Sequence, residues 1–568
     1  MTLDAIINHL VSDTIGSLAL FRPELVLCAT MVVLLLAKII PLLDRIDPFL
    51  LALVGSIAAL VTAFPEGGLS EMAAVGRTEI FTGMLVYDSL TVSLRLILLV
   101  FAVLFVVLAK LTGLADRQDG QDFFTLVLGA TLGMCLMASA NHLMTVFLAV
   151  EMASVPSYVL AGIVKGRRRA GEAALKYAVY GAGAAGVMLY GISLLVGVLG
   201  TAHLPTVATR LTALDIPTML ADGGQMGTLM VLSLSALMIM VGLAFKLSAV
   251  PFHFWCPDVF EGATAEVDAF LSVASKAAAL ALLVRVAVGV SSPLAENVAS
   301  APPAPSVQLA VHVSADGNVG TAAIGVAANA NVESSDPLSP VRTFVATLLG
   351  VVAAVTCTFG NLAAYGQTNI KRMLAYSTIA HAGYMIMPVA AAVLLMGNNR
   401  VAAGEAISAL LIYVAIYLFM NLGAFAIVAF LRNTMQSEMI DDYAGLIRTA
   451  PITAVSMTLI LVSLIGLPPL AGFIGKFAIF MSLVDAGGEL MITLLVIASI
   501  NTAISLVYYL RVAKRICIDP EPDTRGSVQL GILPSAYVFA VTIPVVLLGV
   551  YPTWLTNIAQ VAGEQLFR

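Results

Sequence analysis

The chain has 568 residues, of which 60% are hydrophobic and 11% are charged, and its formal net charge is -6. Soluble proteins carry about 25% charged residues, so this chain has too few charges to cover a globular surface of its size. The composition therefore excludes a soluble enzyme and a disordered chain, and the acidic balance argues against a nucleic-acid-binding protein.

Long unbroken apolar runs predict an all-α polytopic membrane protein, because a transmembrane β-barrel would show short alternating segments. A spanning helix needs about 20 apolar residues, and we predict fourteen spans. In chain order they cover 23–43, 48–64, 89–109, 123–140, 142–163, 172–200, 226–250, 265–290, 342–360, 371–396, 402–431, 450–470, 488–510 and 531–550. The second is short, and the twelfth is expected to continue past a break, over 472–485.

The Lys and Arg residues of the loops orient these spans. Sixteen lie after odd-numbered spans, whereas six lie in the tails and after even-numbered spans. Because cationic loops are retained in the cytoplasm, the bias predicts that both termini are extracytoplasmic. A missed or invented helix would disturb the alternation, so the bias also favours the count of fourteen.

Four ionisable residues remain deep inside the predicted spans, each on a different helix: Glu151, Lys246, Lys276 and Lys476. A charge at the bilayer centre costs about 2.5–3.5 kcal/mol on insertion scales. Several such charges therefore predict mutual pairing and access to water.

Glu151 and Lys246 are the natural pair among these residues. Burial favours the neutral form of a lysine, whereas a nearby carboxylate favours the charged form. A buried lysine whose acidic partner can move is therefore a proton switch. The alternative is a static ion pair that holds two helices together.

Charges nearer the span ends have simpler interpretations. Lys176 and Arg285 are expected to extend their head groups to the membrane interface. Asp258 and Glu261 lie in the string CPDVFEG between the seventh and eighth spans. They are interpreted as caps of the next helix, and the alternative is proton collection at an entrance.

Two predicted spans carry breaks, in MIMVGLAFKLSAVPFHFWCPDVFEGA (238–263) and LILVSLIGLPPLAGFIGKFAIF (459–480). Each combines a lysine with prolines, and such breaks are tolerated in lipid only where protein or water satisfies the backbone. Matching breaks indicate an internal repeat around an ion path, in which spans 4–8 correspond to spans 9–13 in inverted orientation. His381 then lies in the span that matches the span of Glu151, either as a proton relay or as a neutral, hydrogen-bonded histidine.

The predicted organisation follows from this repeat. The loop over 291–341 has no Lys or Arg, and we interpret it as an extracytoplasmic insertion without function, since surface insertions cost little entropy. The predicted divisions are helices 1–3 over 1–122, the first repeat over 123–290, the insertion over 291–341, the second repeat over 342–515 and helix 14 over 516–568.

Several long strings resemble the subunit N family of the proton-pumping NADH:quinone oxidoreductase, respiratory complex I. They are the string around the first break with AFLSVASKAAALALLVRV (269–286), EAALKYAVYGAGAAGVMLYGISLLVG (172–197), GNLAAYGQTNIKRMLAYSTIAHAGYM (360–385) and GLPPLAGFIGKF (466–477). The resemblance covers about residues 15–560 apart from the insertion. PFHFWCPDVFEG is closer to subunit N than to the sodium/proton antiporter subunits, which usually read closer to PFHTWLPDA.

The resemblance implies a fourteen-helix antiporter-like fold with two inverted five-helix repeats. It also implies a location in the bacterial cytoplasmic (inner) membrane, beside sister antiporter-like subunits and smaller membrane subunits. Glu151 and Lys246 match the acid–lysine pair of the family. Lys276 matches the connecting lysine on the next helix, and Lys476 matches the lysine on the second broken helix.

Residues 264–268 depart from the family, because they read TAEVD where the family usually has Pro-Thr-Pro-Val-Thr. The two additional acids, Glu266 and Asp268, are favourable at the start of a helix because of its dipole. They also change the charge near Lys276. The insertion over 291–341 is a second departure.

We therefore expect a proton-translocating subunit of an oxidoreductase that performs no redox chemistry itself. The five cysteines are scattered and the chain lacks a nucleotide-binding fingerprint, so no metal or cofactor is expected here. NADH, FMN, iron–sulfur clusters and quinone are expected in other subunits. The residues expected to transfer protons are Glu151, Lys246, Lys276, His381 and Lys476.

Two other functions stay open. One is a subunit of a multisubunit cation/proton antiporter that works without electron transfer. The other is a structural element of the membrane arm, whose buried charges only hold helices together. Copurification with iron–sulfur subunits distinguishes the first, and an unchanged pumping ratio after charge neutralisation distinguishes the second.

Overall fold

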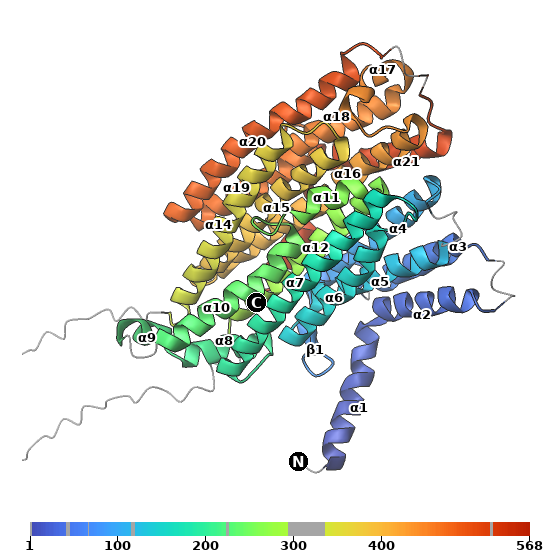
Figure 1. Ribbon diagram of the computed structural model, residues 1–568. Helices are drawn as coiled ribbons and strands as arrows, with labels where there is room; N and C mark the ends of the chain where they lie inside the picture. Colours follow the sequence, from blue (N-terminus) through green and yellow to red (C-terminus); the bar gives the residue numbers. More distant parts are fainter. Residues whose placement is uncertain are drawn as a thin grey trace, which may run out of the picture.

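The computed structural model describes residues 3–40, 46–65, 67–114, 120–222, 226–293, 336–522, 526 and 528–567, so most of the 291–341 insertion lies outside the described residues. The described chain is an α-helical bundle with one two-stranded antiparallel hairpin, β1 (Thr78–Ile80) and β2 (Leu85–Tyr87) (Figure 1). The predicted all-α membrane class is thus confirmed.

Every predicted span overlaps a helix. These helices are α2 (Arg22–Ala37), α3 (Pro48–Thr62), α4 (Ser89–Leu111), α5 (Gly120–Ser139), α6 (Leu143–Ala161), α7 (Arg168–Leu199), α10 (Met226–Leu247), α12 (Ala265–Ser291), α14 (Ser339–Ala364), α15 (Ile370–Leu395), α16 (Arg400–Met435), α18 (Pro451–Ile465) continued by α19 (Ala471–Ala486), α20 (Gly488–Cys517) and α21 (Ile532–Val550). Within the described ranges, 11 helices are long and apolar enough to cross a membrane, and α2, α3 and the α18–α19 pair fall outside that group. Fourteen crossings therefore stays a prediction.

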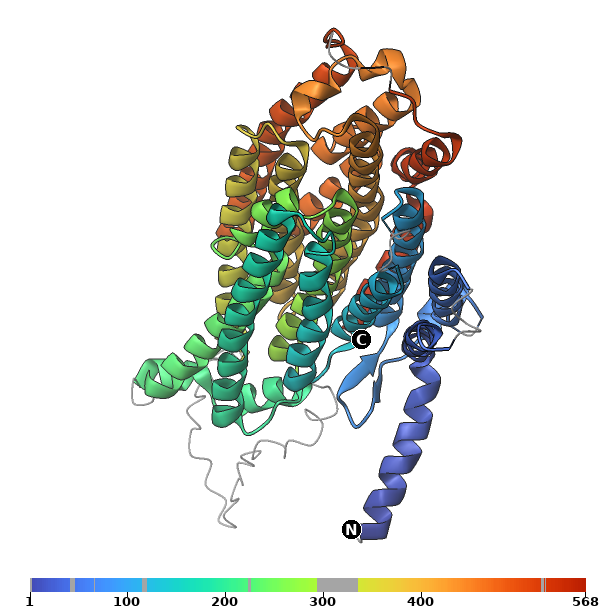
Figure 2. The same ribbon diagram turned by 45° about the vertical axis from the view of Figure 1, so that its right-hand side comes forward.

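The remaining elements lie outside the predicted spans. They are α1 (Leu3–Leu20), η1 (Leu69–Ala74), α8 (Leu204–Ala213), α9 (Ile216–Asp222), α11 (Trp255–Gly262), η2 (Ile440–Tyr443), α17 (Leu446–Thr449) and α22 (Thr553–Gln565). Helix α1 projects away from the bundle in both views, and its second half bends by 81° from α2 (Figure 1 and Figure 2). The bend separates α1 from the first predicted span.

Three helices form the centre of the bundle. Helices α12, α15 and α16 are almost wholly buried and pack against one another. The peripheral helices α7, α14 and α20 expose apolar side chains instead, among them Val179, Val351 and Val496. An apolar outer surface is what a bundle surrounded by lipid requires, since lipid tails are as apolar as these side chains.

Two helix breaks lie where the sequence predicts them. Helix α10 ends at Leu247, and the following Ser248 has a φ of 56°, after which α11 resumes the helical path. Helix α18 ends at Ile465, and Gly466 has a φ of 90° before α19 begins. A positive φ turns the chain out of the helix, so each break leaves backbone carbonyls without partners in the helix.

The same close packing occurs in both predicted repeats. A Cβ added to Gly133 of α5 would lie 2.5 Å from the backbone nitrogen of Ala153 on α6, and one added to Gly360 of α14 would lie 2.5 Å from that of Ala380 on α15. The two glycines are separated by as many residues as the two alanines. Only glycine allows helices to approach so closely. The contact between α5 and α6 therefore recurs between α14 and α15.

Candidate functional site

Lys246 is 2% exposed and lies one residue before the end of α10. Its Nζ donates a hydrogen bond of 2.9 Å to the Oγ of Ser154 on α6. Glu151 lies one turn earlier on α6, is half-buried, and has a buried Oε1 without a hydrogen-bond partner. The predicted pair is therefore close enough for a Coulomb interaction, but it is the Ser154 hydroxyl that accepts the hydrogen bond from the Lys246 ammonium.

Lys276, on α12, is 1% exposed and reaches the same break. Its Nζ donates to the carbonyl oxygen of Leu247 at 2.7 Å and to the Oγ of Ser248 at 2.9 Å. The Leu247 carbonyl is one of those that the end of α10 leaves free. Lys276 thus bonds to the two residues that follow Lys246 by one and two positions, and the two buried lysines are close enough for a Coulomb interaction.

Lys476 satisfies the second break in the same way. It is 3% exposed, and its Nζ donates to the carbonyl oxygen of Ile465, the last residue of α18, at 3.0 Å. The Nζ also lies 4.6 Å from the ring centre of Tyr384, a cation–π contact. Lys476 follows its break along the chain, whereas Lys246 precedes its own. Lys476 instead matches Lys276, because each donates to the carbonyl oxygen of the last residue of a broken helix. The sequence alone could not indicate this correspondence.

His381, on α15, is 2% exposed and bonded at both ring nitrogens. Its Nδ1 lies 2.6 Å from the hydroxyl of Tyr413, and its Nε2 lies 3.1 Å from the hydroxyl of Tyr509. The Tyr509 hydroxyl also shares a short hydrogen bond with Ser377. The sequence shift that relates Gly133 to Gly360 places His381 at the position of Ser154.

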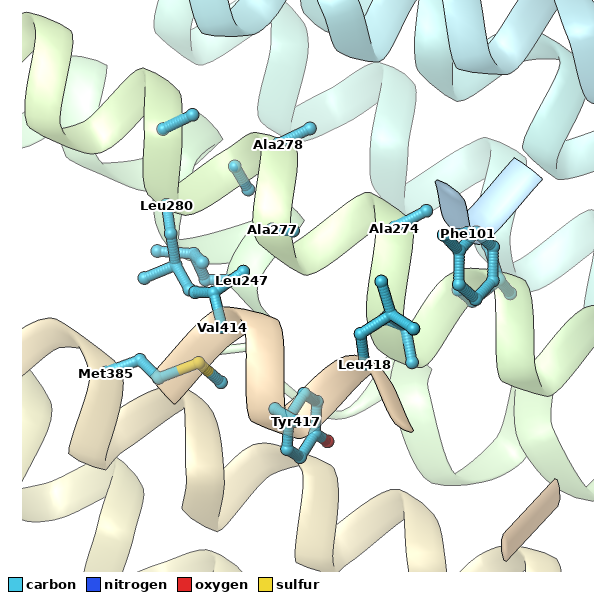
Figure 3. Packing of buried hydrophobic residues seen from close by; sticks show 14 of the residues in the cluster. Phe101, Leu247, Ala274, Ala277, Ala278, Leu280, Met385, Val414, Tyr417 and Leu418 are labelled. Atoms are coloured by element: carbon cyan, nitrogen blue, oxygen red, sulfur yellow. The ribbon is translucent and has the colours of Figure 1, made fainter. Parts of the chain in front are cut away.

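The five predicted residues thus form two groups. Glu151, Lys246 and Lys276 surround the first break, whereas His381 and Lys476 lie together on α15 and α19, joined through the Tyr384 ring. Apolar side chains pack where α12 passes α16, and we define an apolar junction by four of them, Leu247 of α10, Leu280 of α12, Met385 of α15 and Val414 of α16 (Figure 3). Proton transfer between the groups therefore needs movement or hydration of this apolar junction.

A polar network behind Tyr384 was missed in the sequence. The Tyr384 hydroxyl bonds to Thr502 at 3.0 Å, and the neighbouring Asn361 joins α14 to α20 through Asn501 at 3.2 Å and Tyr508 at 3.0 Å. A signal was present, since asparagines inside apolar runs need buried partners. Their partners depend on helix packing, which the sequence does not display.

The charges nearer the span ends differ from their predicted roles. Asp258 pairs with Lys176 at 2.8 Å, and Glu261 pairs with Arg372 at 2.5 Å. The prediction that these acids cap the next helix was wrong, because the side chain of Thr264 caps α12. The acids instead tie α11 to α7 and α15.

Arg285 was wrongly predicted to reach the membrane interface. Its guanidinium is buried, and two of its nitrogens each lie 2.6 Å from an oxygen of Asp88, the N-cap of α4. Burial raises the pKa of the Asp88 carboxyl, but Arg285 and the Thr91 amide outweigh it and lower that pKa to about 2. Two hydrogen bonds to a buried carboxylate replace the contacts that the guanidinium would otherwise make with water.

Within the part of the chain that the structure describes, no three His, Cys, Asp or Glu side chains are gathered as they would be around a metal ion. All five cysteines are described, and all are free thiols.

Comparison with known proteins gives a consistent result. A family model described as "NADH:quinone oxidoreductase/Mrp antiporter, TM" matches residues 140–310 and 319–504. Similar curated proteins include NADH-quinone oxidoreductase subunit N of Anaeromyxobacter sp. (strain Fw109-5), 35% identical over 98% of this chain and 99% of the relative. NADH-quinone oxidoreductase subunit N 2 of Sorangium cellulosum (strain So ce56) is 37% identical over 95% and 96%.

Solved structures agree with these relatives. A chain of respiratory complex I from Thermus thermophilus with bound Aureothin is 29% identical, with a TM-score of 0.66, over 94% of this chain and 98% of that chain. A chain of the Mrp complex from Dietzia sp. DQ12-45-1b is similar in fold, with a TM-score of 0.72 at 16% identity, over 96% and 98%.

Proposed function

Because the chain belongs to the subunit N family of the NADH-quinone oxidoreductases, we propose that it is a proton-translocating subunit in the membrane arm of respiratory complex I. Its partners are the sister antiporter-like subunits and the small membrane subunits. NADH, FMN, iron–sulfur clusters and quinone belong to other subunits, and this chain contributes to the enzyme by moving protons. The loop charges support a place in the bacterial cytoplasmic membrane with both termini outside.

The recurring packing of Gly133 on Ala153 and of Gly360 on Ala380 supports two repeats over 123–290 and 342–515. The His142 side chain caps α6 and the Asn369 side chain caps α15, at positions related by the same shift along the chain. Helices 1–3 and helix 14 flank the repeats in this proposal.

The proposal rests on the burial of Lys246 and Lys276 at one helix break, within Coulomb range of each other. A buried ammonium is tolerated only where hydrogen bonds hold it, and both lysines have such bonds. Two like charges this close disfavour each other, so a proton added to one lysine favours proton release from the other. The pair therefore behaves as a switch with two positions.

Glu151, at the side of the bundle, controls which of the two lysines holds the proton. Its neighbours on α6, Leu148, Met152 and Val155, are exposed apolar residues, so this face meets lipid or another membrane subunit. A change of charge in a neighbouring subunit would attract or release the Glu151 carboxylate and so stabilise or destabilise the Lys246 ammonium. The proton released from Lys246 then passes to Lys276.

The second group completes the route. From Lys276 the proton crosses the apolar junction to His381 and then reaches Lys476. Histidine suits an intermediate position because its two nitrogens can accept a proton on one side and release one on the other. Each proton moved against 100 mV requires about 2.3 kcal/mol, which quinone reduction elsewhere in the complex supplies.

Replacing Lys246 by Ala tests the proposal. The assembled complex is measured in membrane vesicles for protons pumped per electron transferred, and we expect that ratio to fall. Lys38→Ala is the matched control, because Lys38 pairs with Asp122 at the exposed end of α2. Unchanged pumping in an assembled Lys246→Ala complex would remove Lys246 from the route and favour a structural role. Purification of the chain in a complex that lacks iron–sulfur subunits would favour a cation/proton antiporter.

A further inference from the structure

A buried carboxyl outside the described groups lies at the start of α12. Asp268 is 0% exposed, and neither of its carboxyl oxygens has a hydrogen-bond partner. It belongs to the string TAEVD over residues 264–268. Burying a carboxylate without hydrogen bonds costs free energy of folding, so an ionised Asp268 would destabilise the protein.

The charged groups that face Asp268 come from three helices and the loop after α16. They are Glu266 on α12, Lys371 on α15, Arg432 on α16 and Glu438 in the loop. Lys371 Nζ lies 3.9 Å from Asp268 Oδ2. We name these five residues the Asp268 cluster.

Lys371 does not neutralise Asp268 through a hydrogen bond. Its Nζ lies 2.7 Å from the carbonyl oxygen of Ala263, 3.3 Å from that of Glu261 and 3.0 Å from Oε1 of Glu438. An ammonium has three N–H donors, and these three acceptors take them all. A static ion pair between Lys371 and Asp268 would instead show a direct hydrogen bond.

The charge balance of the Asp268 cluster leaves room for one proton. Its three carboxyls and two cations carry one negative charge in excess when all are ionised. Glu438 is supported by both Lys371 and Arg432, at 3.0 and 3.2 Å, whereas Asp268 has no donor. One proton on Asp268 makes the cluster neutral and turns the unsupported carboxylate into a carboxylic acid.

Two hydroxyl side chains lie between Asp268 and Lys276 along α12. Residues 268, 272, 275 and 276 share one face of α12, because positions four, seven and eight apart are neighbours on a helix. The hydroxyls belong to Ser272, whose Oγ donates to the carbonyl oxygen of Ala269 at 3.0 Å, and to the buried Ser275. The distance along the axis is about 12 Å at 1.5 Å per residue, which hydroxyl and water hydrogen bonds can bridge.

We propose that Asp268 is an additional proton-binding residue, which takes a proton from the cytoplasmic side and passes it to Lys276. The O–H bond of the Asp268 carboxylic acid breaks and an N–H bond forms on the neutral amine of Lys276, so the products are a carboxylate and an ammonium. Asp268 then takes the next proton from the cytoplasmic side. This inference rests on the proposed function.

Asp268→Asn tests the inference in the assembled complex in vesicles. We expect coupled turnover to fall about tenfold, with a larger loss at alkaline pH, because positioned acids accelerate proton transfer by one or more orders of magnitude. Asp268→Glu should restore most of the turnover. Asp122→Asn, which alters an exposed acid outside the Asp268 cluster, is the control and should leave turnover and the pH profile unchanged.

The outcomes separate this inference from the proposed function. Wild-type turnover and pH profile in Asp268→Asn, together with lost pumping in Lys246→Ala, would overturn the role of Asp268 alone. Normal pumping in Lys246→Ala would overturn the proposed function itself. Should Asp268→Asn fail to assemble, infrared difference spectra of the wild type and Asp268→Glu decide. A protonated-carboxyl band that shifts in the variant supports the inference, and the absence of such a band overturns it.

Discussion

At the scale of single residues, the buried lysines combine two tasks. Lys276 and Lys476 each donate to a carbonyl that a helix end leaves free, and each is the charge that the proposed route requires. Lys246 bonds to Ser154 and not to its predicted acid. The carbonyl contacts imply that replacing these lysines changes both the local fold and the chemistry, so substitutions must be chosen to separate the two.

Lys476→Arg and Lys476→Met make that separation. Arg keeps a donor for the Ile465 carbonyl but stays protonated at every accessible pH, so we expect assembly to be retained and pumping per electron to fall. Met leaves the carbonyl without a partner, which costs about 1–3 kcal/mol, so the amount of assembled complex should fall as well. Native gels measure assembly, and vesicles measure pumping. Full pumping by Lys476→Arg would show that Lys476 need not release its proton.

The sequence drew attention to these buried residues but did not indicate their partners. A lysine or glutamate inside an apolar run is visible because it contradicts its surroundings, which is why Glu151, Lys246, Lys276 and Lys476 were found; their roles remain predictions. Tyr413 and Tyr509 are ordinary in a membrane helix, so nothing in the sequence marks them as partners of His381. Which faces meet is decided by packing between distant helices.

At the scale of elements, the two breaks are the decisive features. Prolines and glycines gave their positions, because these residues interrupt helices in predictable ways. The sequence did not give the identity of the donor at each break. In the first break the donor comes from the next helix, α12, and in the second it comes from the continuing helix, α19.

Gly466→Ala should damage the second break. Gly466 has a φ of 90°, and an added Cβ would lie 2.8 Å from Cδ of Lys476. We expect displacement of the lysine, a loss of about 1–3 kcal/mol from backbone strain, and reduced pumping per electron in the complex that assembles.

Gly183→Ala is the matched control for this substitution. Gly183 lies inside α7 with nothing within 4 Å of an added Cβ, so alanine should be neutral or slightly stabilising there. If Gly466→Ala matched this control in both assembly and pumping, the geometry of the break would not matter.

At the scale of the whole molecule, one buried ion pair joins α4 to the first predicted repeat, and a second joins α2 to α4. Asp88 at the start of α4 binds Arg285 of α12, and Glu24 of α2 lies 2.6 Å from Arg95 of α4. Hydropathy located the helices but could not order them in space. These pairs explain why α4 lies against α12, an arrangement that the apolar pattern alone left undetermined.

The Asp88–Arg285 pair predicts how stability depends on pH. The pKa of Asp88 is about 2 in the folded protein and about 3.9 in an unfolded chain, so the pair stabilises the fold above pH 4. Its contribution, of the order of 2 kcal/mol, is lost as the pH falls from about 4 towards 2.

Thermal unfolding in detergent checks this prediction. Asp88→Asn should lower the melting temperature at pH 7 and remove part of the decline between pH 4 and 2. A parallel decline in the variant and the wild type would assign the acid sensitivity to other carboxyls.

The hydrogen bonds of Lys276 have a consequence for durability. An amine that has given up its proton still carries two N–H groups, and Lys276 has two acceptors, the Leu247 carbonyl and the Ser248 hydroxyl. Discharge therefore removes a charge without undoing either bond. Lys276 can therefore gain and lose its proton in every catalytic cycle while the packing of α12 against the end of α10 stays the same.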